Sequence, residues 1–234
     1  MLIVVCGALA LAAAWLWVRQ RTLRRAAFIR QFELPAGLFD KLRQHHPGLS
    51  QKDCQLVAQG LRQFFLAYLA GGLRPVSMPS QVVDALWHEF ILYTRNYQAF
   101  CQQAFGRFMH HTPAVALRQE RAADAGLKRC WWHACRAENI NPKAPTRLPL
   151  LFALDAKLGI ANGFLYMADC QGVRRTSAGG ADGGAVHCGG DLAGCSGGGG
   201  GFGDGAGDGS GGGDGGGGGG DGGSGCGGGG CGGS

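Results

Sequence analysis

The chain has 234 residues, 45 of them glycine, and a formal net charge of +6. Residues 1–175 hold all 22 basic side chains and ten of the 16 acidic ones, a net +12, whereas the later residues carry the other six acidic side chains, a net −6. The arginines flank the N-terminal apolar segment or are scattered, so nucleic acid is not an expected partner. Only residues 19 to about 175 have a composition able to bury a conventional core, and their number suits one domain.

Residues 2–18 carry no charge. Seventeen apolar residues lie at the lower bound for a membrane-spanning helix, which needs about 20. The alternative is a cleaved signal peptide, but no basic residue precedes the run. Trp15 and Trp17 lie near its end, and four arginines follow it. We therefore predict a single-pass inner-membrane anchor over residues 1–18, with the N-terminus outside and the main domain cytoplasmic. A basic juxtamembrane helix over 19–33 is expected to meet anionic lipid headgroups.

The next segments predict helices separated by Gly and Pro. Phe39 to His45 is expected to be a short helix, and Ser50 with Asp53 resembles a capping box at the start of a second one. Apolar residues keep helical spacing from there until Gly71 and Gly72.

The segment from Pro79 to Gly106 is predicted to be one helix. Its apolar stripe comprises Leu86, Phe90, Tyr93, Tyr97 and Cys101. Asp84, His88 and Arg95 fall on another side of the same helix, and Trp87 borders both faces. His110 and His111 follow in a short exit segment ending at Pro113.

Residues 115–137 and 150–158 are expected to form two further helices, with few strands or none anywhere. Cys130 and Cys135 are five positions apart and share a helix face poorly, which favours buried thiols over metal ligands. In a cytoplasmic domain the ten cysteines are expected to be reduced. From residue 176 onward glycine dominates, without the strict period of collagen, and predicts a disordered tail.

The sequence thus predicts an all-α protein in four parts. These are a transmembrane anchor over 1–18, a juxtamembrane helix over 19–33, a helical domain over 34–175 and a disordered Gly-rich tail over 176–234.

The motif Asp84-x-x-Trp87-His88, continued by Thr94, Tyr97, Phe100-Cys101 and Gly106, resembles the core motif of the glycine-rich domain-containing proteins. The resemblance covers residues 80–113 well, extends loosely to residues 149–155, and is matched by the Gly-rich C-terminus. It implies a largely helical domain of unsettled biochemical role. The His-x-His pair common in that family is missing, because Glu89 and Phe90 follow His88.

Two interpretations of the polar residues remain open at the level of the sequence. In the first, Asp84 and His88 bind zinc or another divalent metal together with His110 or His111, and Cys101 or Glu89 is a further candidate ligand. In the second, a structural cluster forms, in which Asp84 orients His88 and pairs with Arg95 while Trp87 and Tyr97 complete the packing; the sequence favours this one.

No catalytic residue is assigned from the sequence. Cys101 could act as a nucleophile beside His88 or His110, but its position on the apolar stripe is typical of an inert thiol. The expected function is a membrane-anchored interaction or scaffold module with an unidentified protein partner and a flexible tail. The alternative is a metal-binding protein, such as a metal-dependent hydrolase, centred on His88.

Overall fold

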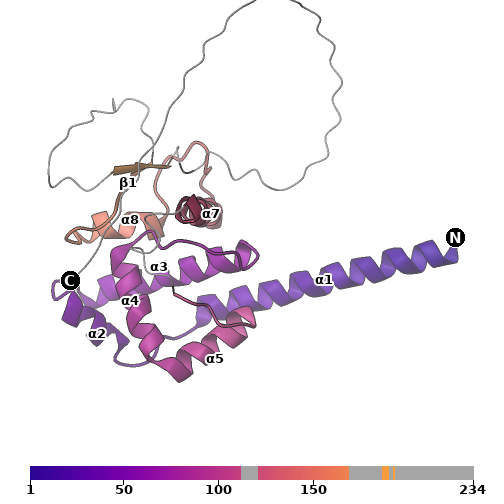
Figure 1. Cartoon of the computed structure of the whole chain (residues 1–234), viewed down its shortest axis with the longest axis horizontal. Coiled ribbons are helices and arrows are strands. Elements are labelled where there is room, and N and C mark those ends of the chain that lie inside the picture. The colour runs from indigo at the N-terminus through magenta and orange to yellow at the C-terminus, as the bar shows by residue number, and fades with distance from the viewer. Residues whose placement is uncertain (112–120, 169–185, 190–191, 193–234) are drawn as a thin grey trace, which may run out of the picture. The chain divides into compact units, whose positions relative to one another are not determined.

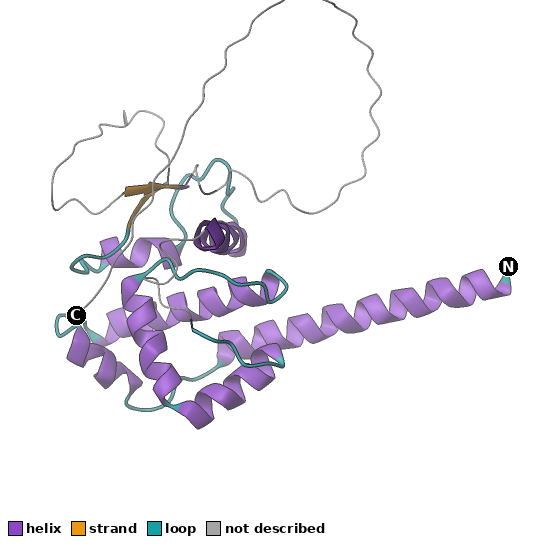
Figure 2. Cartoon of the chain, viewed as in Figure 1, coloured by secondary structure: helices purple, strands orange, loops and turns teal. Residues whose placement is uncertain are grey.

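The computed structural model describes residues 1–111, 121–168, 186–189 and 192 (Figure 1). Helices make up most of this part of the chain, and strand is confined to two three-residue segments (Figure 2). The predicted helical character is therefore correct. Most of the Gly-rich tail predicted over 176–234 lies outside the described residues, but residues 186–189 and 192 are described, and three of them form a strand, which corrects the prediction of disorder there.

Helix α1 (Leu2–Gln31) corrects the membrane prediction. None of the helices in the described part of the chain combines enough length with enough apolar character to cross a bilayer. The uncharged run ends after residue 18, and the same helix continues directly into Arg19 and the arginines that follow. The predicted transmembrane anchor is therefore wrong, and so is the single-pass inner-membrane location that rested on it.

The C-terminal part of α1 belongs to the core. Ile29 is fully buried, and the rings of Phe28 and Phe32 pack on Phe100, with centroids 5.7 and 4.6 Å away. Arg62 of α3 holds this end of the helix in place, because its Nε and Nη2 both donate to the Phe32 carbonyl oxygen, at 3.2 and 2.9 Å.

Helices α2 (Leu38–His45) and α3 (Gln51–Ala70) lie where the sequence predicts them. The capping box at Ser50 is present, since Ser50 Oγ accepts from the Asp53 backbone N–H and Asp53 Oδ2 accepts from the Ser50 N–H. Helix α3 is the centre of the fold: it packs against α1, α2, α4, α7 and α8. Two of its phenylalanines, Phe64 and Phe65, are essentially fully buried.

The predicted single helix between Pro79 and Gly106 is instead two helices, α4 (Gln81–Leu92) and α5 (Thr94–Phe105). Tyr93, with φ −78° and ψ 61°, ends the first and begins the second. The helical spacing of the apolar residues continues across this break, so the sequence does not indicate it. Leu92 shows the change of direction, because 70% of this apolar residue is exposed at the end of α4.

Helices α7 (Arg121–Ala137) and α8 (Leu150–Lys157) complete the described helices. Cys130 and Cys135 of α7 are fully buried and free, as the sequence predicts. Burial raises the pKa of both thiols, that of Cys135 to about 12 with help from the nearby charge of Glu138. Neither thiol is therefore available as a thiolate near neutral pH.

Glu138 connects three of these helices at the end of α7. Its carboxylate accepts from Gln63 Nε2 of α3 at 2.7 Å, from the Leu150 N–H at the start of α8 at 2.6 Å, and from Arg147. Burial alone would raise the pKa of Glu138, but these hydrogen bonds outweigh it and lower the pKa. The charged carboxylate therefore stabilises the folded state.

The strands β1 (Leu165–Met167) and β2 (Val186–Cys188) pair in parallel, with Leu165 opposite Val186. Cys188 is disulfide-bonded, which departs from the prediction that the cysteines are reduced. The five other cysteines among the described residues are free.

Candidate metal centre

The site begins at the N-terminus of α4, which is anchored by a buried carboxylate from α8. Asp155 is only 2% exposed, and Ser80, the N-cap residue of α4, donates to its Oδ1 at 2.6 Å. The backbone N–H groups of Gln81 and Val82 donate to the same carboxylate at 2.8 and 3.2 Å, and that of Phe164 at 2.9 Å. A negative charge at a helix N-terminus satisfies N–H groups that have no partner within the helix. Helix α4 is thereby fixed where it presents Asp84 and His88, one turn apart.

Gly106 returns the chain toward α4 after α5 ends. Its φ of +74° lies in the left-handed region that favours glycine, and it closes α5 by donating to the Cys101 and Gln102 carbonyl oxygens. A Cβ at this position would also lie 2.4 Å from Arg25 Nη2. The positive φ favours glycine here, and a larger residue would also displace the end of the Arg25 side chain.

Tyr97 holds the returning segment beside α4. Its buried hydroxyl donates to the Met109 carbonyl oxygen at 2.6 Å and accepts from Trp87 Nε1 at 3.2 Å. Burial raises the pKa of this phenol well above its usual range, so it remains a donor at every physiological pH. The two hydrogen bonds tie α4, α5 and the segment before His111 together.

Asp84, His88 and His111 converge as a result. Each offers one ligand atom, and the three atoms all lie within 4.8 Å of one another. His111 Nε2 lies 2.8 Å from Asp84 Oδ1, and His88 Nδ1 lies 3.5 Å from Oδ2 and 2.8 Å from the Asp84 backbone oxygen. The centroids of the two imidazole rings are 4.1 Å apart. The His111 ring also packs edge-to-face with the Trp87 indole, with the ring centroids 4.5 Å apart.

The cluster is open on one side. The His111 side chain is 10% exposed and that of Asp84 is 21% exposed, whereas half of the His88 side chain is exposed. An ion held by these residues could therefore keep a position for water or another small ligand, as catalytic sites do.

The remaining residues predicted to belong to the site do not join the cluster. The His110 ring turns to Phe108 instead, with centroids 4.9 Å apart. Glu89 binds His45 Nε2 at 2.9 Å. Cys101 is fully buried, and burial raises its pKa, which argues against a nucleophilic thiolate.

Arg95 was placed beside Asp84 only because α4 and α5 were taken as one helix. It is exposed on α5, and among the described residues no ion pair joins it to Asp84. Its predicted place in the polar cluster is therefore wrong. The other contact of that cluster is present, since Trp87 and Tyr97 are hydrogen-bonded.

Comparison with protein families gives a match over residues 24–192, more than half of the chain. The chain belongs to the UCP032817-like family. This family is uncharacterised, so membership assigns no activity. Neither the curated proteins nor the solved structures contain a match.

Membership of the UCP032817-like family corrects the resemblance to the glycine-rich domain-containing proteins, which is wrong. That resemblance rested on residues 80–113, where Asp84, Trp87 and Tyr97 serve helix packing and local hydrogen bonds. Most of the Gly-rich end of the chain, which also suggested the resemblance, follows the matched residues.

Two polar residues near the site in this UCP032817-like chain, Asp155 and Arg107, are not predicted as functional by the sequence. Asp155 caps α4 across 75 positions of sequence, and Arg107 binds Tyr68 across 39. Their partners are distant in sequence, so no local spacing indicates them. The one usable signal was an Asp in a helix whose other residues are mostly apolar.

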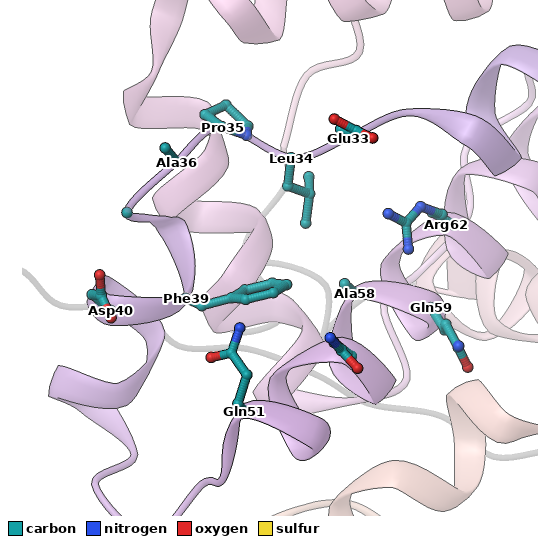
Figure 3. Close-up of a pocket in the computed structure, with 12 residues that line it drawn as sticks. Glu33, Leu34, Pro35, Ala36, Phe39, Asp40, Gln51, Ala58, Gln59 and Arg62 are labelled. Carbon is teal, nitrogen blue, oxygen red and sulfur yellow. The ribbon is translucent and has the colours of Figure 1, made fainter.

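A cavity of about 520 Å³ lies elsewhere, between the α1–α2 connection and α3. In Figure 3, Phe39 of α2 and Arg62 of α3 point toward each other across it. The described residues that line this cavity include no histidine or cysteine, and none belongs to the Asp84 cluster. It is therefore separate from the candidate metal centre.

Proposed function

We propose that this protein binds one divalent metal ion, zinc in the first instance, through Asp84, His88 and His111. The observation that supports this is the convergence of three ligand atoms from segments 27 positions apart. Two imidazoles and one carboxylate are a donor set suited to zinc and to ferrous iron. The function is then the metal-centred one that the sequence offers as its alternative.

The distances support a mononuclear site. Two ligands bound at about 2.0–2.1 Å from one tetrahedral zinc lie about 3.3–3.4 Å from each other. The ligand atoms of His111 and His88 lie 2.8 and 3.5 Å from the two oxygens of Asp84. An ion bound there would replace the hydrogen bond between His111 and Asp84, and His88 Nδ1 would have to give up its hydrogen bond to the Asp84 backbone oxygen.

The electrostatics also support the proposal. The sequence placed the positive charge of Arg95 on the same helix face as the ligands, where it would repel a cation. With Arg95 exposed on α5, that objection is removed.

With three protein ligands and an open side, a bound zinc ion would lower the pKa of a coordinated water to about 7. The ion would then supply Lewis acidity and an activated water, which suits hydrolysis. His88, the most exposed of the three ligands, borders the open side.

The role as an interaction or scaffold module stays a prediction. It rested on the Gly-rich tail, most of which lies outside the described residues, and on a membrane anchor that the structure does not support.

Metal analysis of the purified full chain tests the proposal. The protein is produced with zinc, iron and manganese in the medium, and bound metal is measured by mass spectrometry for wild type, Asp84→Asn, His88→Ala and His111→Ala. His110→Ala is the matched control, because His110 adjoins His111 in sequence but faces Phe108.

We expect about one equivalent of metal in wild type and in His110→Ala, and a loss of at least tenfold in affinity for each ligand variant. Stoichiometric iron in place of zinc would keep the site and change the ion. Trace metal in the wild type, unchanged in the three ligand variants, would leave only a structural polar cluster and reject the proposal.

A further inference from the structure

A second cavity, of about 420 Å³, adjoins the candidate metal centre. Its size is within the range of small-molecule sites, about 300–1,000 Å³. It lies between the loop before α4 and the segment that follows α5. The residues that line it are mainly aromatic or apolar and include Tyr68, Met78, Trp87 and Phe108. Flat rings stack well on such walls, and methionine sulfur adds favourable contacts with aromatic ligands.

The cavity has one fixed cationic group, the guanidinium of Arg107. Nε and Nη2 donate to the Tyr68 hydroxyl at 3.2 and 2.8 Å, and Nη2 also donates to the Leu73 carbonyl oxygen. The guanidinium carbon also lies 5.8 Å from the centroid of the Tyr68 ring. These contacts hold the guanidinium in place and leave its Nη1 group out of them.

No acidic residue is among the described residues that line this cavity, and none in the described part of the chain forms an ion pair with Arg107. His110 also lines the cavity and can donate a hydrogen bond from a ring nitrogen. The Arg107 Nη1 group, which the contacts with Tyr68 and Leu73 do not use, can donate a charge-assisted hydrogen bond to the carboxylate of a ligand.

Trp87 connects this cavity to the metal centre. Its indole lines the cavity and also packs on the ring of His111, a proposed metal ligand. The adjacent histidines are divided between the two sites, since His110 lines the cavity and His111 meets Asp84. A ligand in this cavity would therefore be separated from the proposed metal ligand His111 by the Trp87 indole.

We infer that this cavity binds a small aromatic carboxylate, with its ring against Phe108, which is 40% exposed, and its carboxylate on Arg107. The binding site stands on the cavity and Arg107 alone. Its role as the place where a substrate of the metal centre is held rests on the proposed function.

Calorimetric titration of the full chain with 2-naphthoate and its neutral analogue 2-naphthamide tests the inference. Both are titrated into protein treated with chelator and into protein loaded with zinc. Arg107→Gln removes the charge, and Arg95→Gln, an exposed arginine on the preceding helix, is the matched control. Met78→Trp fills the cavity and keeps Arg107, so it covers the case in which Arg107→Gln fails to fold.

We expect wild type and Arg95→Gln to bind naphthoate at least tenfold more tightly than naphthamide. Arg107→Gln should lose that preference and keep its affinity for naphthamide, and Met78→Trp should bind neither. Equal affinities of the wild type for the two ligands, or naphthoate binding that survives Met78→Trp, would overturn the inference.

The two proposals can fail separately. If the chain holds no metal but binds naphthoate in a way that depends on Arg107, the inferred ligand site stands and the proposed metal centre is rejected. Stoichiometric metal without naphthoate binding keeps the metal centre and rejects the cavity.

Discussion

Replacing Tyr97 with phenylalanine tests how the returning segment is held beside α4. The hydroxyl that is removed bonds Trp87 Nε1 at 3.2 Å and the Met109 carbonyl oxygen at 2.6 Å. The phenylalanine ring should keep the packing on Phe90 and Phe108, both 5.3 Å away between centroids. The substitution therefore isolates the hydrogen bonds from the packing.

The expected loss of stability follows from burial. Trp87 and Tyr97 are 3% and 1% exposed, so water cannot replace the missing hydroxyl. A buried donor or acceptor left without a partner costs about 1–3 kcal/mol, and two such groups predict a loss of about 2–6 kcal/mol. Urea denaturation followed by circular dichroism measures this free energy, with an unchanged m-value as the check for two-state unfolding.

Tyr93→Phe is the matched control. Its hydroxyl donates to the Ala36 carbonyl oxygen at 3.3 Å in an exposed setting, where water can take its place, so the expected loss is below about 1 kcal/mol. If Tyr97→Phe and Tyr93→Phe lose the same amount, within about 0.5 kcal/mol, Tyr97 does not hold the segment and the reasoning is refuted.

Three further predictions use the same denaturation assay. Asp155→Asn should lower the free energy of unfolding by about 3 kcal/mol or more, because four hydrogen-bond donors face its buried carboxylate. The exposed substitution Asp40→Asn should change this free energy little. Gly60→Ala should destabilise by about 1–3 kcal/mol, since the new Cβ would lie 2.4 Å from Leu154 Cδ1; a gain of the roughly 1 kcal/mol of helix propensity would contradict this. Burial lowers the pKa of His133, with a smaller effect from the charge of Arg136. Below about pH 6.5 the imidazole therefore takes up a proton in the unfolded chain before it does so in the folded one, and the free energy of unfolding should fall. His133→Gln should flatten that fall between pH 7 and 5, and an unchanged profile would exclude His133 as its cause.

Local patterns predicted the parts of the fold that depend on neighbouring residues. The capping box at Ser50 and Asp53 spans four positions, and the chain there needs no distant partner. Asp84 and His88 are one helical turn apart, so their proximity also follows from spacing. The meeting of His111 with Asp84 could be posed only as a question, because it depends on the turn at Gly106 and on the bond from Tyr97 to Met109.

The error at Arg95 has a similar physical origin. Apolar periodicity reports which residues face the core, and both α4 and α5 face it, so the pattern runs through Tyr93 without interruption. A helical wheel drawn across such a break assigns the polar residues beyond it to the wrong side. The same limit applies to α1, where the uncharged run was read as an anchor although its helix continues into the domain.

The Trp87–Tyr97 part of the structural cluster and the metal centre, which the sequence presents as rivals, use different atoms. Tyr97 fixes the backbone at Met109, whereas the metal would take the side chain of His111. Packing and hydrogen bonds thus bring the ligands together before any ion binds, and chelation should leave the near-ultraviolet circular dichroism of the folded chain unchanged. Free zinc at 100 times its Kd should add about 2.7 kcal/mol to the free energy of unfolding. Unfolding of the chain on chelation would show instead that the ion assembles the site.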